Sequence, residues 1–137
     1  MTTDPAVPQL LQTVLDCTDP RELAEFYRQL LGYRYRPGDE PGEDEDVDWL
    51  VLLKPAGDRG LAFQQVDELP QTTWPEPGVP QQMHLDMTVP DREQLEAQHE
   101  RALSLGAHLV LDRTDDPDEP LRVYADPAGH RFCIFVG

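Results

Sequence analysis

The segment Pro127-Ala128-Gly129-His130-Arg131 repeats, with one change, the segment Pro55-Ala56-Gly57-Asp58-Arg59, which lies 72 residues earlier (127 minus 55). Both segments have the proline and glycine content of tight turns. Two further pairs keep the same spacing, namely Asp19 with Asp91 and Gln12 with His84. Matched pairs at one spacing indicate a duplicated structural module, because such agreement is hard to generate by chance.

The first copy of the module is predicted to contain a strand, a helix and three further strands. Asp19 followed by Pro20 is typical of a helix N-terminus, and Gly32 marks the end of this helix. Between them, apolar residues recur at spacings of three and four, as on the buried side of an amphipathic helix. The predicted strands are Leu10–Cys17, Tyr33–Tyr35, Trp49–Leu53 and Leu61–Val66.

The second copy repeats this order, with a helix that begins at Pro90-Asp91 and ends at Gly106. Its predicted strands are Met83–Val89, His108–Leu111, Leu121–Ala125 and Arg131–Val136. Each half therefore has the order βαβββ. We expect one domain over residues 1–137, with module one at about 10–67, a proline-rich linker at 68–81 and module two at about 82–137.

Strand alternation predicts which side chains face away from the helices. In the first strand Gln12 and Asp16 share a face, and in the matching strand His84 and Asp86 do so. This face is unusually polar, which is consistent either with a sheet surface in contact with water or with a cavity lined by polar groups. The same alternation places Cys17 on the helix side and Cys133 on the opposite face, so both are predicted to be free thiols.

The charge of the chain excludes several classes of partner. There are 27 Asp and Glu residues against 11 Lys and Arg residues, a formal net charge of −16. Nucleic acids and anionic membrane surfaces need basic patches, so neither is expected as a partner. No apolar run reaches the roughly 18 residues of a membrane span, and Met1–Leu10 lacks signal-peptide features. A cytoplasmic location is therefore predicted, with solvated loops at Arg36–Asp48 and Asp112–Pro120.

Several motifs together resemble the vicinal oxygen chelate superfamily, the group of glyoxalases, bleomycin-resistance proteins and extradiol dioxygenases. The motifs are Asp19–Gly32 (DPRELAEFYRQLLG), His84-Leu85-Asp86, Leu105-Gly106-Ala107 and Asp126–Cys133 (DPAGHRFC). The resemblance implies an α+β fold in which two βαβββ modules form a curved eight-stranded sheet around a cavity. It also implies a homodimer, because members of the superfamily often pair modules between chains.

In metal-dependent members of that superfamily, four side chains from the first and last strands of each module hold one divalent ion. Position by position, the resemblance implies Gln12, Gln64, His84 and Cys133, with Leu61 and Gln65 as alternatives to Gln64. This set lacks the carboxylates that usually neutralise a divalent cation, so the expected cavity has no obligatory metal. Asp16 and Asp86 lie on the right strand faces to replace them, which keeps a divalent metal as the alternative.

The predicted function is a glyoxalase-like protein that binds a small molecule and whose reaction is unassigned. Its ligand pocket is predicted to contain Gln12, Asp16, Gln64, His84, Asp86 and Cys133. The alternative is a metal-dependent lyase, isomerase or dioxygenase that acts on a small oxygenated substrate and uses His84 to hold the ion. The sequence has no nucleophile elbow, phosphate loop or dinucleotide fingerprint, so no catalytic residue is assigned.

Overall fold

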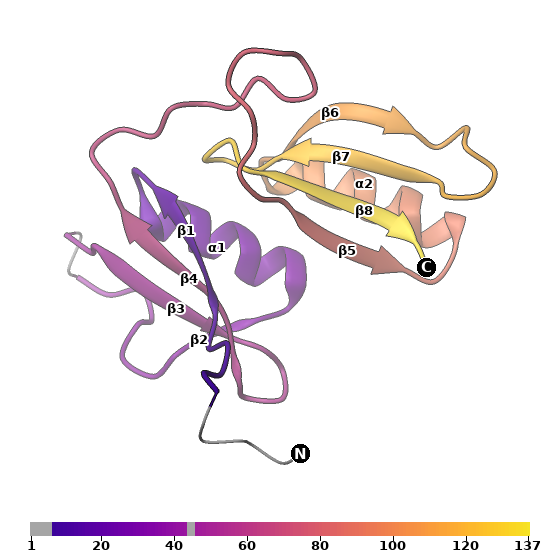
Figure 1. The fold of residues 1–137 in the computed structure, drawn as a ribbon. Helices are drawn as coiled ribbons and strands as arrows, with labels where there is room; N and C mark the ends of the chain where they lie inside the picture. The colour runs from indigo at the N-terminus through magenta and orange to yellow at the C-terminus, as the bar shows by residue number, and fades with distance from the viewer. Residues whose placement is uncertain (1–6, 44–45) are drawn as a thin grey trace.

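In the computed structural model, which describes residues 7–43 and 46–137, the chain forms two four-stranded sheets, each with one helix (Figure 1). The first sheet has the order β1-β4-β3-β2 and the second the order β5-β8-β7-β6. The first contains β1 (Thr13–Cys17), β2 (Arg34–Tyr35), β3 (Trp49–Leu53) and β4 (Arg59–Gln65). The second contains β5 (Leu85–Val89), β6 (His108–Arg113), β7 (Leu121–Ala125) and β8 (Arg131–Val136).

The predicted α+β fold with two βαβββ modules is confirmed. Strands β1 and β5 begin 72 residues apart (85 minus 13), as do β4 and β8 (131 minus 59). In each module the first strand pairs with the last in parallel, and the remaining pairs are antiparallel. The eight strands are divided between two hydrogen-bonded sheets, so the curved surface consists of two halves.

The first strand of each module is shorter than predicted. Strand β1 begins at Thr13, which pairs with Leu61, whereas Leu10 and Leu11 lie outside the sheet and are 91% and 60% exposed. In the same way β5 begins at Leu85 and not at Met83. An apolar residue beside a strand extends the sequence pattern without belonging to the ladder.

Helix α1 (Pro20–Leu31) begins and ends as the sequence predicts. The Asp19 side chain accepts a hydrogen bond from the backbone N–H of Glu22 at 3.2 Å, and Gly32 ends the helix in the left-handed conformation (φ 70°). Its apolar residues are buried: Leu23, Ala24, Phe26, Tyr27 and Leu30. Helix α2 (Arg92–Leu105) is capped in the same way by Asp91, but only Leu95 and Ala102 are buried.

Helix α1 packs against both sheets. The ring of Tyr27 lies 6.1 Å from that of Phe63 in β4 and 6.1 Å from that of Phe132 in β8. Phe26 also contacts Phe132, with the ring centroids 5.8 Å apart. Residues of both modules consequently form one continuous hydrophobic core. The opposite faces of the two sheets, which point away from the helices and are called the outer faces below, are therefore available for a functional site.

Polar contacts also join the modules. The Tyr27 hydroxyl donates to Oδ2 of Asp126 at 2.6 Å, and both residues are almost completely buried. From α2, the Arg101 guanidinium donates to the backbone carbonyls of Gln29 and, at 3.1 Å, Leu30 at the end of α1. These carbonyls have no partner within the helix, so Arg101 completes the hydrogen bonding of its C-terminus.

The described parts of the two acidic segments lie mostly on the surface, as predicted, and side-chain contacts hold both, with Asp112 of the second segment 3.2 Å from Arg122. The Asp39 carboxylate accepts from the backbone N–H of Val51 at 2.9 Å and pairs with Arg36 at 3.1 Å. Residues 44–45 of the first segment, like residues 1–6, lie outside the described residues. Neither α1 nor α2, the helices in the described part of the chain, has the length and apolar character needed to cross a membrane.

Candidate functional site

The outer face of the first sheet carries three of the predicted pocket residues. Asp16 in β1 pairs with Gln64 in β4, so their side chains share this face. Of the two alternatives to Gln64, Leu61 is buried in the core, and Gln65 pairs with Cys17 on the helix side. Gln12 lies just before β1, and its Oε1 accepts a hydrogen bond from Arg59 at 3.3 Å.

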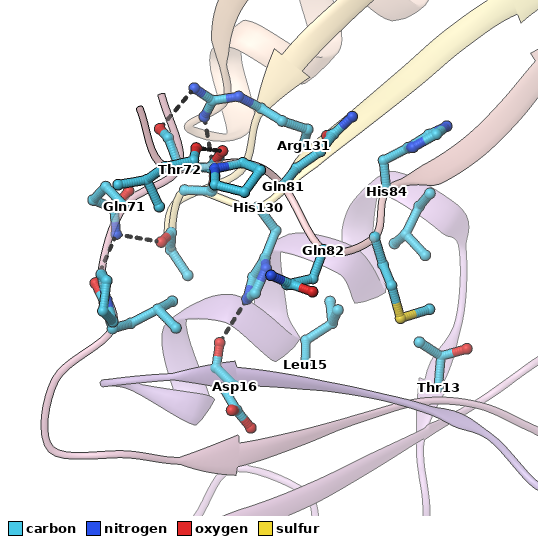
Figure 2. A pocket seen from close by; sticks show the side chains of 18 of the residues that line it. Thr13, Leu15, Asp16, Gln71, Thr72, Gln81, Gln82, His84, His130 and Arg131 are labelled. Atoms are coloured by element: carbon cyan, nitrogen blue, oxygen red, sulfur yellow. Dashed lines mark hydrogen bonds between the residues drawn. The ribbon is translucent and has the colours of Figure 1, made fainter. Parts of the chain in front are cut away.

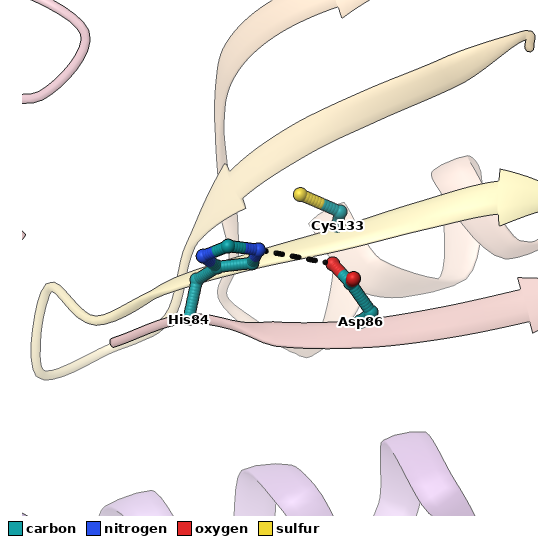
Figure 3. Close-up of side chains that lie close together, drawn as sticks. All are labelled: His84, Asp86 and Cys133. Carbon is teal, nitrogen blue, oxygen red and sulfur yellow. Dashed lines mark ion pairs between the residues drawn. The ribbon is translucent and has the colours of Figure 1, made fainter.

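The outer face of the second sheet brings three predicted residues together (Figure 3). His84 Nε2 and Asp86 Oδ1 are 3.3 Å apart, and Asp86 pairs with Cys133 in the parallel ladder of β5 and β8. One ligand atom of each of the three residues lies within 4.8 Å of the other two. His84, Asp86 and Cys133 therefore form a compact cluster of nitrogen, oxygen and sulfur groups.

A cavity of about 180 Å³, called the outer-face cavity below, adjoins this cluster. Leu111, Leu121 and Val123 of β6 and β7 form an apolar wall, and His84 and Cys133 lie at its β5–β8 side. The remaining lining residues are Trp74, Gln81, Arg113 and Arg131. An apolar wall with a few polar groups is the usual form of a small-molecule site.

The linker between β4 and β5 forms part of the cavity wall because Arg131 holds it in place. The Arg131 guanidinium donates from Nη2 to the carbonyl oxygens of Trp74 at 3.0 Å and Thr72 at 3.3 Å, and from Nε to that of Trp74 at 3.2 Å. Gln71 Nε2 donates to the carbonyl of Ala128 at 2.9 Å. Through these bonds the linker brings Trp74 over the outer face of the second sheet.

A second cavity, of about 410 Å³, lies where the two modules meet and is called the junction cavity (Figure 2). Residues 13–16 of β1 line one side, and the linker and the β7–β8 turn line the other. His130 Nε2 lies 2.6 Å from the backbone oxygen of Asp16 across the cavity. The two cavities share Gln81, His84 and Arg131, which form the wall between them.

Gln81, in the wall between the two cavities, carries a polar atom without a partner. Its Oε1 is buried and accepts no hydrogen bond from the described residues. Most buried polar atoms in folded proteins have a partner, so an unpaired one in a cavity wall indicates that a polar occupant completes it.

The two cysteines lie on opposite sides of their sheets, as strand alternation predicts, and both are free. Burial raises the pKa of the Cys17 thiol to about 12. Burial, followed by the nearby carboxylates of Asp86 and Glu119, raises the pKa of Cys133 to about 11. Both thiols are consequently protonated at neutral pH, and neither is an activated nucleophile.

The donor set of the cluster fits a metal ion better than the four positions that the resemblance implies. An imidazole, a carboxylate and a thiol are three ligands of the kind that catalytic zinc sites use, with a fourth position left for water or substrate. Gln12 and Gln64 line neither cavity; Gln64 belongs to the other sheet, and Gln12 precedes β1 of that sheet. If a metal binds this chain, His84, Asp86 and Cys133 would hold it, after loss of the thiol proton.

Sequence reasoning missed Arg113, Gln81 and Arg131 as lining residues. Arg131 was within reach, because it lies two residues before Cys133 in β8 and so shares its face. Arg113 lies beyond the predicted end of its strand at Leu111, and β6 in fact continues to this residue. Gln81 belongs to an irregular linker, where no periodicity gives the direction of a side chain.

Two βαβββ modules, with a cavity on the outer face of a sheet, define the vicinal oxygen chelate class of proteins. The chain belongs to the family of glyoxalase-like domains, whose model matches residues 12–135. No curated protein matches the sequence significantly.

Solved structures share the fold at low sequence identity. A glyoxalase/bleomycin resistance protein/dioxygenase family enzyme from Burkholderia phytofirmans is similar with a TM-score of 0.68 and 14% identity, over 92% of this chain and 96% of that one. The fosfomycin resistance protein FosX from Listeria monocytogenes, complexed with Mn(II) and sulfate, has a TM-score of 0.66 and 16% identity, over 96% and 93% of the two chains. A possible glyoxalase from Bacillus cereus has a TM-score of 0.63 and 14% identity, over 93% and 98%.

Proposed function

We propose that this protein binds a small organic molecule in the outer-face cavity, in contact with His84. The observation that carries the proposal is the cluster of His84, Asp86 and Cys133 beside an apolar wall. The unpaired Oε1 of Gln81 supports it, because the same wall offers an acceptor that a ligand can satisfy. The ligand's apolar part would lie on Leu121 and its neighbours in β6 and β7.

Nuclear magnetic resonance with a set of small fragments tests this proposal while the natural ligand is still unidentified. Neutral and anionic aromatic fragments are added to the labelled protein, and the amide signals of Val123 and Cys133 are followed. We expect saturable shifts at these residues that disappear in His84→Asn. The matched control His108→Asn changes an exposed histidine of the same sheet that lines neither cavity. If no fragment of either class shifts the two signals, the proposal is wrong.

A metal-dependent lyase, isomerase or dioxygenase is the second candidate, and the spacing of the cluster favours it. A bound ion would polarise an oxygen of the substrate. His84, Asp86 and Cys133 would hold that ion, which leaves one position for the substrate. FosX, which shares the fold, is complexed with Mn(II), but a thiol ligand favours a softer ion such as zinc. Zinc titration by calorimetry is expected to show one site whose affinity Cys133→Ser lowers. An equal zinc affinity in the variant would show that the cluster is not the zinc site.

We further propose a homodimer in which the outer face of the first sheet covers that of the second sheet in another copy. In one chain Gln64 and His84 belong to the outer faces of different sheets, so a second copy would bring the two groups of predicted residues together. Val14 and Met83 are 40% and 67% exposed, which leaves apolar surface for such a contact. Light scattering is expected to give a dimer that Val14→Glu weakens. A monomer at every concentration would refute the proposal.

A cytoplasmic location is also part of the proposal. Both cysteines are free thiols, which is the usual state in a reducing compartment. Fractionation of cells that express the chain is expected to place it with cytoplasmic markers, and recovery with secreted or membrane proteins would contradict this.

A further inference from the structure

The outer-face cavity has the opposite charge character from the rest of the chain. The whole sequence carries a formal net charge of −16. None of the described residues that line this cavity is acidic, whereas Arg113 and Arg131 both line it. An acidic surface repels anions at long range, so two arginines in one small cavity create a local site of opposite sign.

Neither arginine has a carboxylate partner among the described residues. Arg113 has no hydrogen bond or ion pair from its side chain in this part of the chain, although six other ion pairs are present there. Within residues 7–43 and 46–137, the Arg131 side chain donates only to the backbone carbonyls of Thr72, Trp74 and Gly129. Carbonyl oxygens satisfy its N–H groups but do not neutralise its charge.

Arg131 is partly buried, and its charge is only partly compensated. Burial lowers the pKa of its guanidinium, and Asp126 offsets this effect only in part. A cation that is partly removed from water and only partly balanced by a carboxylate is stabilised when an anion binds beside it. A ligand with a negatively charged group supplies the counter-charge that the lining residues lack.

The sheet register gives the direction in which such a ligand would lie. Arg113 belongs to β6 and Asp86 to β5, which are the two edges of the second sheet. Negative charge therefore lies at the β5 edge, where Asp86 pairs with His84 at 3.3 Å. Asp86 and Glu119, the carboxylates that act on Cys133, are not lining residues of the cavity.

We propose that the ligand of the outer-face cavity is a small anion with an apolar body, whose carboxylate, phosphonate or phosphate group pairs with Arg113 in the field of Arg131. This inference rests on the proposed function, because it names the class of ligand for the same cavity. The apolar body lies against Leu121 and Val123, and the uncharged end points toward His84.

Two probes of the same ring but different charge test the inference, namely phenylphosphonate and benzyl alcohol. Both are titrated into the protein while the amide signals of Val123 and Cys133 are recorded. A charge-assisted hydrogen bond predicts that phenylphosphonate binds at least about tenfold more tightly than benzyl alcohol. Its affinity is also expected to fall as sodium chloride is added, whereas that of benzyl alcohol does not.

Variants locate the effect in the cavity. Arg113→Gln is expected to weaken phenylphosphonate about tenfold, and Arg113→Lys less, because a lysine keeps the charge but not the planar fork. Arg131→Gln is expected to weaken it as well, although this change also removes hydrogen bonds that hold the linker. Arg113→Gln still tests the inference if the linker moves, because Arg113 is exposed and its side chain has no hydrogen bond to a described residue. The matched control Arg34→Gln removes an exposed arginine of the first sheet that also binds only carbonyls, and it is expected to have no effect.

The outcomes separate the two proposals. If benzyl alcohol binds as tightly as phenylphosphonate and the arginine variants bind both normally, the anion inference is wrong while small-molecule binding in the cavity stands. If neither probe nor any other fragment shifts the two signals, the proposed function fails, and the inference fails with it. An equal loss of phenylphosphonate binding in Arg34→Gln would show a general effect of charge and would also refute the inference.

Discussion

Replacement of Tyr27 by phenylalanine removes one hydroxyl from the contact between the modules and nothing else. The hydroxyl donates to Asp126 Oδ2 at 2.6 Å, and Asp126 is 2% exposed. The carboxylate keeps its hydrogen bonds from the backbone N–H groups of Ala128 and His130, and the aromatic ring keeps its place in the core. Loss of one donor to a buried charged acceptor predicts a loss of stability of about 2 kcal/mol.

The effect of Tyr27→Phe depends on pH in a defined direction. Burial raises the pKa of the Asp126 carboxyl, and the hydrogen bond from Tyr27 lowers it. A folded-state pKa above the unfolded one means that this group destabilises the fold increasingly as pH rises from about 4 through the folded pKa. The variant raises that pKa further. Its loss of stability is therefore expected to grow over this window and to level off above it.

Urea unfolding followed by circular dichroism measures the difference, with the slope of the transition expected to stay constant. Tyr33→Phe is the matched control, because the Tyr33 hydroxyl has no hydrogen bond within the described residues and this variant is expected to be nearly neutral. The double variant with Asp126→Asn tests the partner. Equal losses in the two tyrosine variants, or a Tyr27→Phe effect unchanged in the Asp126→Asn background, would refute the reasoning.

Three further predictions concern separate parts of the molecule. Iodoacetamide is expected to modify Cys133 faster than Cys17, because Cys17 is 1% exposed, and mass spectrometry that shows a bridge between them would contradict their opposite faces. Hydrogen bonds from the N–H and hydroxyl groups of Thr114 lower the pKa of Asp112 to about 2. The Asp112 carboxylate therefore stabilises the fold above about pH 4, and this effect is lost as pH falls toward 2. The melting temperatures of Asp112→Asn and the wild type should accordingly converge at pH 2. Arg101→Ala removes the donors to the last carbonyls of α1 and should lower the free energy of unfolding in urea by about 1 kcal/mol. An unchanged free energy would show that water replaces the guanidinium.

Local features of the fold were predictable because they depend on neighbouring residues. The aspartate caps and the glycines that end the two helices lie where the pattern predicts them. The strand faces of Cys17 and Cys133 follow from alternation alone. The packing of α1 between the sheets was not predictable, because an amphipathic face shows that a helix is buried but not what covers it. Contacts such as Phe26 with Phe132 join residues that no local pattern relates.

The candidate site was predictable to a similar extent. Alternation indicated that His84 and Asp86 share a face and that Cys133 also faces away from the helices, and one ligand atom of each of the three lies within 4.8 Å of the other two. Sequence reasoning placed Gln12 and Gln64 in the same pocket, but the chain carries them on another sheet. The roles of Trp74 and Arg131 depend on where an irregular linker runs, which is decided by hydrogen bonds between distant segments.

The packing of Tyr27 against Phe132 has a consequence for synthesis of the protein on the ribosome. Phe132 follows Tyr27 by 105 residues (132 minus 27). At a synthesis rate of about 5–20 residues per second, β8 is therefore made roughly 5–20 s after α1. During that interval the apolar side chains of α1 that pack against β8 in the folded protein are uncovered. We therefore expect the nascent first module to bind chaperones that shield apolar surface, and to lose this binding when β8 has formed.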